Sequence, residues 1–107
     1  MRLRRGPFDE LVERQLALFA ADESALLAEA DEAEAAWVRA GREDAEEAYG
    51  DYQLVVDAIA DRILEIREAY AGTLAGHNAE SYRLAFSAAV KRRFGRYASL
   101  VSDVDST

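Results

Sequence analysis

The chain has 107 residues and a formal net charge of −8, and half of its residues are apolar. This length suits one domain spanning residues 1–107, and the apolar content is too high for intrinsic disorder. The 22 alanines outnumber 12 β-branched residues, and there are only six glycines and one proline, so the composition predicts an all-α protein and excludes a β-sandwich or barrel. Zero cysteines and one histidine exclude disulfides, thiolate nucleophiles and any site that needs two histidines.

The first predicted helix covers residues 7–40. Pro7 suits the first helical position, and Asp9 and Glu10 follow where the helix dipole favours acids. Seam residues then recur at alternating spacings of four and three, which is the pattern of a coiled coil, and Gly41 ends the helix. The seam reads Val12, Leu16, Phe19, Glu23, Leu26, Ala30, Ala33, Trp37 and Ala40, so Glu23 is its one polar member.

The second predicted helix covers residues 43–72 and repeats the same spacing. Its acidic first turn again matches the positive end of the helix dipole. All of its seam residues are apolar: Ala45, Tyr49, Tyr52, Val56, Ile59, Ile63, Ile66 and Tyr70. Two helices of similar length with so short a connection must fold back on each other as an antiparallel hairpin.

The hairpin register follows from the position of the turn near Arg42. Facing residue numbers then sum to about 85, as in an antiparallel pair of equal helices. Small residues face large ones in this register, and Glu23 faces Arg62, so we expect an ion pair that tolerates the acid in the seam. The expected neighbours are Leu26 and Ile59, Phe19 and Ile66, Leu16 and Tyr70, and Ala33 and Tyr52.

A shorter third helix is predicted over residues 78–101, with Asn78 as its N-cap. We expect Arg93, which lies inside its apolar arc, to reach an acid on the hairpin; Gly95 is an alternative end of the helix. The ends of the chain, 1–6 and 102–107, are predicted to be flexible. The fold expected is a long antiparallel coiled-coil-like hairpin with a third helix, completing a bundle by oligomerisation. The apolar arc consists of Tyr82, Phe86, Ala89, Val90, Phe94, Tyr97 and Val101.

Basic residues gather in the third helix, whereas residues 6–76 hold 18 acids and five arginines. Cations interleaved with aromatics are typical of nucleic-acid contact, but they also complement an acidic hairpin, and we favour this internal use. The alternative function is therefore a regulatory or nucleic-acid-associated protein. Its contacts are Lys91, Arg92 and Arg96, together with Arg83.

The sequence gives only weak indications of metal binding or catalysis. The pairs Asp57 and Asp61, and Glu43 and Glu47, lie one helical turn apart and are compatible with a weak divalent-ion site, but acidic helices produce such pairs by chance. His77 has no partner at a metal-ligand spacing. We therefore expect no catalytic residue, cofactor or metal; a small enzyme or weak metal-binding bundle is the least favoured class.

The third helix is too short to reach the hairpin turn, which leaves residues 30–52 as a bare two-helix arm. Exposed aromatic and apolar groups of this kind mark association sites. We therefore predict a non-enzymatic interaction or scaffold module that self-associates, first as a homodimer, or binds another helical protein. In the alternative, the tryptophan folds over the turn and caps the hairpin. The predicted partner interface consists of Trp37, Val38, Tyr49 and Tyr52.

The expected location is the cytoplasm. No segment has the roughly 18 consecutive apolar residues of a membrane span. The basic residues at the start of the chain precede no apolar run, so we expect neither a secretion signal nor contact with a membrane.

Overall fold

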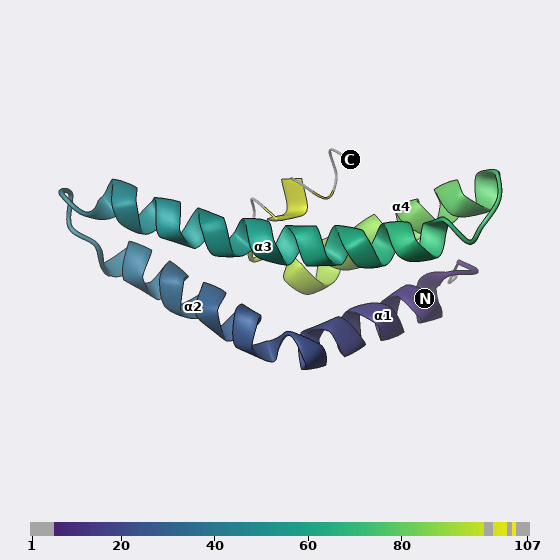
Figure 1. Cartoon of the computed structure of the whole chain (residues 1–107), viewed down its shortest axis with the longest axis horizontal. Coiled ribbons are helices and arrows are strands. Elements are labelled where there is room, and N and C mark those ends of the chain that lie inside the picture. Colours follow the sequence, from purple (N-terminus) through teal and green to yellow (C-terminus); the bar gives the residue numbers. More distant parts are fainter. Residues whose placement is uncertain (1–5, 98–99, 103, 105–107) are drawn as a thin grey trace, which may run out of the picture.

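The computed structural model describes residues 6–97, 100–102 and 104, and in these ranges it contains helices and no strand (Figure 1). The helices are α1 (Asp9–Asp22), α2 (Ser24–Arg39), α3 (Ala45–Ala71) and α4 (His77–Phe94). Residues 100–102 are also helical. The all-α prediction is confirmed, and the helices pack as a small bundle about 50 Å long.

An antiparallel hairpin forms the frame of the molecule. Helix α3 runs the length of one side, and α2 and α1 follow each other along the other side (Figure 1). The turn between α2 and α3 is tight, and the Asp44 N–H donates to the Gly41 carbonyl at 3.0 Å. The predicted ion pair is present, with Arg62 Nη1 3.8 Å from Glu23 Oε2. This pair confirms the predicted register at the centre of the hairpin.

The first predicted helix is broken, and the expectation of one continuous helix over residues 7–40 is wrong. Glu23 leaves the helical conformation, with φ −109° and ψ 32°. Its N–H still donates to the Phe19 carbonyl and its own carbonyl accepts from Leu27, so the break costs little backbone hydrogen bonding. It falls at the one polar seam residue, where no apolar contact to α3 opposes a bend. Because of this bend α1 packs mainly on α4, whereas α2 packs on α3.

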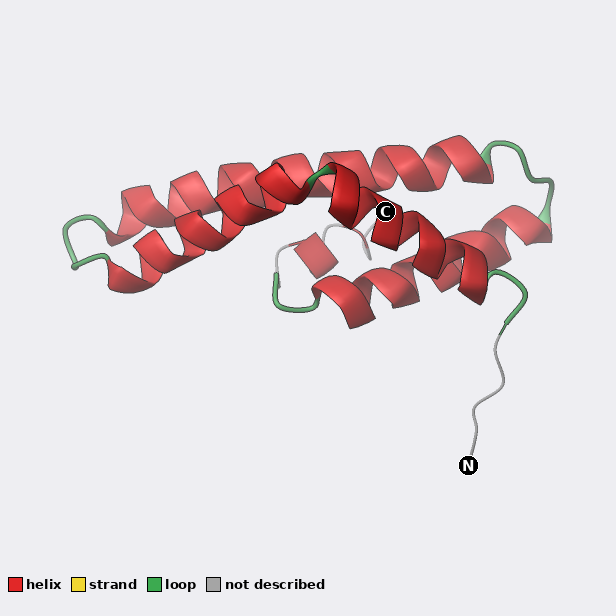
Figure 2. Ribbon diagram, turned by 90° about the horizontal axis from the view of Figure 1, so that it is seen from below, coloured by secondary structure: helices red, strands yellow, loops and turns green. Residues whose placement is uncertain are grey.

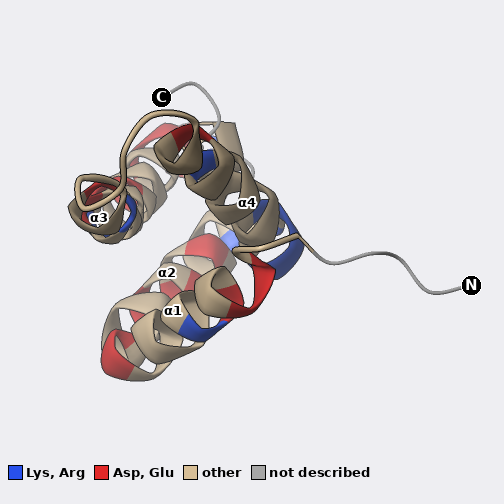
Figure 3. Cartoon of the chain, turned by 90° about the vertical axis from the view of Figure 1, so that its right-hand side faces the viewer, with Lys and Arg blue, Asp and Glu red and all other residues tan. Residues whose placement is uncertain are grey.

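Helix α4 lies against α1 and α3 and closes one end of the molecule (Figures 2 and 3). Tyr82 is fully buried, and its ring lies 4.8 Å from Tyr70 and 5.7 Å from Phe8. Further along, Phe94 meets Phe19 edge to face at 5.9 Å. Aromatic contacts of this geometry add to the burial of the rings. This end is a three-helix core.

Two boundaries of the third predicted helix need correction. The helix begins at His77 after Gly76, which has the left-handed φ of 57°, so Asn78 is inside the helix and not its N-cap. It ends at Phe94, at the glycine that was the alternative end. The left-handed φ of Gly76 explains the start of the helix better than side-chain capping does, and at Gly95 an added Cβ would lie 2.7 Å from the Lys91 carbonyl oxygen.

The chain after α4 returns to the core, so the prediction of a flexible segment 102–107 is wrong at Val104. Tyr97, Leu100 and Val104 are each at most 2% exposed. Beneath them lies Arg67, a buried cation whose Nη1 donates to the Val104 carbonyl at 3.4 Å and whose Nε donates to Glu68 at 2.7 Å. Residues 1–5, 103 and 105–107, also predicted to be flexible, lie outside the described residues.

Candidate functional site

The end of the α2–α3 hairpin lies beyond the reach of the third helix. The last contacts from that side are made by Arg96, which pairs with Asp31 and Glu34, and by Tyr97, whose hydroxyl donates to Asp31 at 2.8 Å. The predicted bare arm of residues 30–52 is therefore too long, because Ala30 is fully buried. Residues 35–51 remain as a two-helix projection, which we call the uncovered arm (Figure 1).

An aromatic cluster occupies the seam of the uncovered arm and its base. Trp37 stacks on Tyr52 with ring centroids 5.5 Å apart and 21° between the planes, and Tyr49 meets Trp37 at 4.8 Å. Tyr52 is only 5% exposed, so it is a buried support of the cluster and offers little surface to a partner. Trp37 and Tyr49 are 37% and 40% exposed. One face of the indole is thus held against α3, while other parts of the ring face solvent.

Val38, the residue after Trp37, is a further exposed apolar residue of the uncovered arm. It is 76% exposed, the largest value among the exposed large hydrophobic residues of the described chain. Around it the turn carries both signs of charge, from Arg39 and Arg42 against Glu43 and Asp44. An apolar centre with a mixed charged rim is the composition of a protein–protein interface.

The basic residues of the third helix mostly meet acids of the same chain. Arg92 pairs with Glu13 at 2.8 Å, and Arg96 pairs with Asp31 and with Glu34. Lys91 is exposed on the same helix. These positions use positive charge to attach α4 and the segment after it to the acidic hairpin.

Arg83 pairs with Glu68 at 2.8 Å, near the start of α4. The hydrogen bond from Arg83, reinforced by Arg67, lowers the pKa of the Glu68 carboxyl to about 2. The expected partner of Arg93 is not found: its side chain is exposed, and no ion pair to it occurs within the described part of the chain.

Buried tyrosines complete the polar contacts of the closed end. The Tyr82 hydroxyl donates to Gln15 at 2.7 Å, and burial raises its pKa to about 12. Burial and the hydrogen bond to Asp31 raise the pKa of Tyr97 to about 12 as well. Both phenols therefore stay neutral at physiological pH and act as structural donors.

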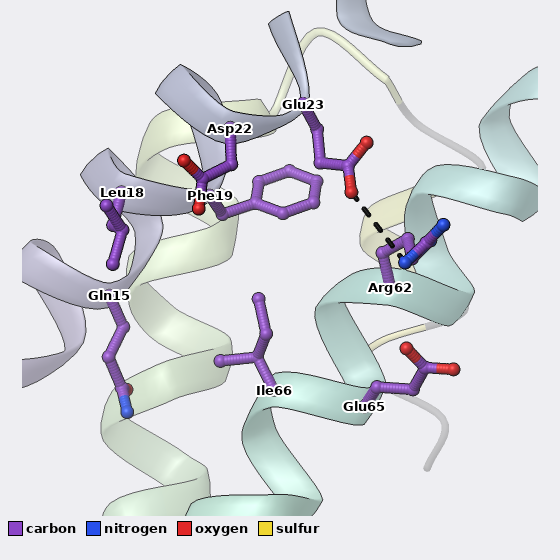
Figure 4. Close-up of a pocket in the computed structure, with 8 residues that line it drawn as sticks. All are labelled: Gln15, Leu18, Phe19, Asp22, Glu23, Arg62, Glu65 and Ile66. Carbon is purple, nitrogen blue, oxygen red and sulfur yellow. Dashed lines mark ion pairs between the residues drawn. The ribbon is translucent and has the colours of Figure 1, made fainter.

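Two grooves were missed by sequence reasoning. The first has a volume of about 400 Å³ and lies between α1 and α3, where Phe19 and Ile66 face each other beside the Glu23–Arg62 ion pair (Figure 4). The second has a volume of about 520 Å³ and lies between α2 and α3. The sequence feature that could have indicated the grooves is the pair Leu18 and Leu54, two large apolar residues outside the seams. They are 61% and 70% exposed in the structure.

Neither a metal site nor a membrane-spanning helix occurs in the described residues. No three side chains of His, Asp or Glu lie close enough together there to form a metal site, and no helix there has both the length and the apolarity to cross a membrane. His77 is exposed at the start of α4. No protein-family model matches the chain, and no curated protein or solved structure matches it.

Proposed function

We propose that the protein is a non-enzymatic helical interaction module that self-associates, most simply as a dimer, through the end of the uncovered arm. The observation that carries this proposal is the exposure of Trp37, Val38 and Tyr49 on a part of the molecule that no other helix among the described residues covers. Aromatic anchors in a small apolar patch supply most of the binding energy in protein interfaces.

The aromatic stack supports the proposal because it orders the surface before a partner arrives. Trp37 contacts both Tyr49 and the buried Tyr52, so its side chain loses little further freedom on binding. Rigid aromatic side chains reduce the entropic cost of association.

A second copy fits this end by both chemistry and charge. Two arms that meet at their ends bring together two apolar patches and complete a four-helix arrangement locally. The arginines at 39 and 42 then have the acids at 43 and 44 of the other copy as counter-charges.

Sedimentation velocity tests the proposal through an exposed residue that makes no ring contact. In Val38→Asp a charge enters the patch, and we expect the population of dimers to fall by about tenfold or more. Leu84→Asp is the matched control, because Leu84 is 70% exposed on α4, far along the chain from the arm. It should sediment as the wild type does. A wild type that is monomeric at all concentrations, or equal effects of the two substitutions, would contradict self-association through this patch.

A further inference from the structure

The two grooves lie on one face of α3. Five of the lining residues, Ala48, Asp51, Val55, Arg62 and Ile66, fall within an arc of about 60° at ~100° per residue. The side chains that α3 buries are centred about 110° around the helix from the middle of this arc, at ~100° per residue. The two grooves follow each other along this face of α3, and we call them together the acidic trough.

On α2, the residues that line the acidic trough point away from the segment that follows α4. Asp31 faces the segment after α4, because it accepts hydrogen bonds from Arg96 and Tyr97. Glu29 and Glu32 line the trough and lie roughly a third to nearly half a turn around α2 from Asp31. On the α2 side, the trough and the segment after α4 therefore lie on different faces of the hairpin, whereas at the α1 end Gln15 and Phe19 line the trough and also contact α4.

Charge in the trough is strongly one-sided. Arg62 is its one cation, and it is already paired with Glu23 at 3.8 Å. Of the acids, only Glu23 has an ion pair within the described part of the chain. The acids that line the trough are Asp22, Glu23, Glu29, Glu32, Asp51 and Glu65.

The trough is also lined by apolar side chains. Leu18 and Leu54 are 61% and 70% exposed, and Val55 and Ile66 are half-buried beside them. Phe19 lines the first groove, and the apolar positions Ala33, Ala36 and Ala48 of the second groove are small, so the backbone of another helix has room to approach closely there. The trough spans 48 to 66 on α3, which is about 28 Å at ~1.5 Å per residue.

We propose that the acidic trough binds one basic amphipathic helix of a partner protein, about 18–20 residues long and aligned with α3. Its apolar face meets Leu18, Leu54 and Ile66, and its lysines or arginines meet the acids on both rims. This helix completes the side of the bundle that α4 leaves open.

A second copy of this chain is not the occupant of the trough. Two such troughs face to face bring six acids against six, and repulsion between like charges suppresses that pairing. The trough overlaps the uncovered arm at Ala36, Ala48 and Asp51. The dimer proposal rests on Trp37, Val38 and Tyr49, however, and these residues line neither groove. The two proposals therefore stand or fall separately.

Binding of designed peptides to the full chain tests the proposal. The probe is a fluorescent peptide of about 20 residues made of leucine and lysine, with the leucines at helical spacing. Controls are a peptide of the same composition in scrambled order and a leucine–glutamate peptide with the same spacing. We expect fluorescence anisotropy to show that the first peptide binds at least about tenfold more tightly than either control. Its binding should weaken at high salt.

Matched variants locate the binding. Leu54→Asp should weaken binding by about tenfold or more, whereas Leu84→Asp, at the same 70% exposure on α4, should change it by less than about twofold. The pair Glu29→Gln and Glu32→Gln should weaken it more than the pair Glu46→Gln and Glu47→Gln at the start of α3. Circular dichroism checks that each variant remains helical.

Three outcomes would overturn the proposal. One is absence of binding, and another is equal binding of the ordered and scrambled lysine peptides, which would mean that charge alone attracts them. The third is a change of oligomeric state in Leu54→Asp with no change in peptide affinity, because the trough would then be an interface between copies. The Val38→Asp variant should bind the peptide as the wild type does, whether or not the protein dimerises.

Discussion

The two ends of the hairpin carry the same seam pattern but differ in how deeply the seam residues are buried. At the closed end α4 covers the seam, and Leu16, Ile63 and Phe86 are fully buried. In the uncovered arm two helices alone hold the seam, and Trp37 and Tyr49 remain over a third exposed. A coiled-coil seam therefore specifies which residues point inward, whereas the number of helices packed around the seam decides whether those residues are buried.

The largest expected effect is the difference in stability between the two ends. Phe86→Ala removes a fully buried ring from the three-helix core and should lower the free energy of unfolding by about 3–5 kcal/mol. Tyr49→Ala in the arm, where the ring is 40% exposed, should cost about 1 kcal/mol. Urea denaturation measures both. Equal losses would mean that the arm is as tightly packed as the closed end.

Arg67 attaches the segment after α4 to the closed end. Arg67→Ala removes the hydrogen bond to the Val104 carbonyl and should lower the free energy of unfolding by about 2–3 kcal/mol. Hydrogen exchange at residues 100–104 should become faster, while exchange in α2 should not change. Exchange that rises equally in both regions would argue against a local attachment.

Acid should weaken the closed end through Glu68. Its pKa of about 2 lies below its ordinary value, so the stabilisation is complete above about pH 5 and is lost as the pH falls toward 2. The side chain is 45% exposed, and solvent screening reduces the effect to about 1 kcal/mol. Unfolding of the wild type and Glu68→Gln at several pH values measures it. The wild type should lose its advantage over this range, and a constant difference would contradict the assignment.

The smallest effect is expected at the bend. The Glu23–Arg62 pair is long, at 3.8 Å, and the Arg62 side chain is 58% exposed, so it contributes at most about 0.5 kcal/mol. Glu23→Leu should be neutral or slightly stabilising in thermal unfolding. A loss above about 1 kcal/mol would show that Glu23 has a further structural role at the break between α1 and α2.

Periodicity predicted the helical hairpin, its central register and the position of the exposed aromatics, because these depend on residues that repeat along one helix face. It did not predict the bend at Glu23, since an acid in a seam is equally compatible with a paired straight helix. The burial of Arg67 and Val104 depends on how the chain returns after α4, and no local pattern encodes that return.

The sequence did not predict the grooves either, for a related reason. Leu18 and Leu54 lie outside the seams, and an isolated exposed leucine is ordinary in any protein. Only the packing of α3 against both α1 and α2 brings them onto one face with the acids. The aromatic residues of the arm were predictable as a group, but the burial of Tyr52 required the stack with Trp37.

The central claim, that a second copy covers the end of the arm, is tested most directly by acrylamide quenching of Trp37 over a range of protein concentrations. Trp37 is the only tryptophan in the chain, so its fluorescence reports this site alone. The account predicts accessible fluorescence in dilute solution, consistent with 37% exposure, and progressive protection as the concentration rises. Val38→Asp should abolish this protection. Quenching of the wild type that stays the same from nanomolar to high micromolar concentration would contradict the account.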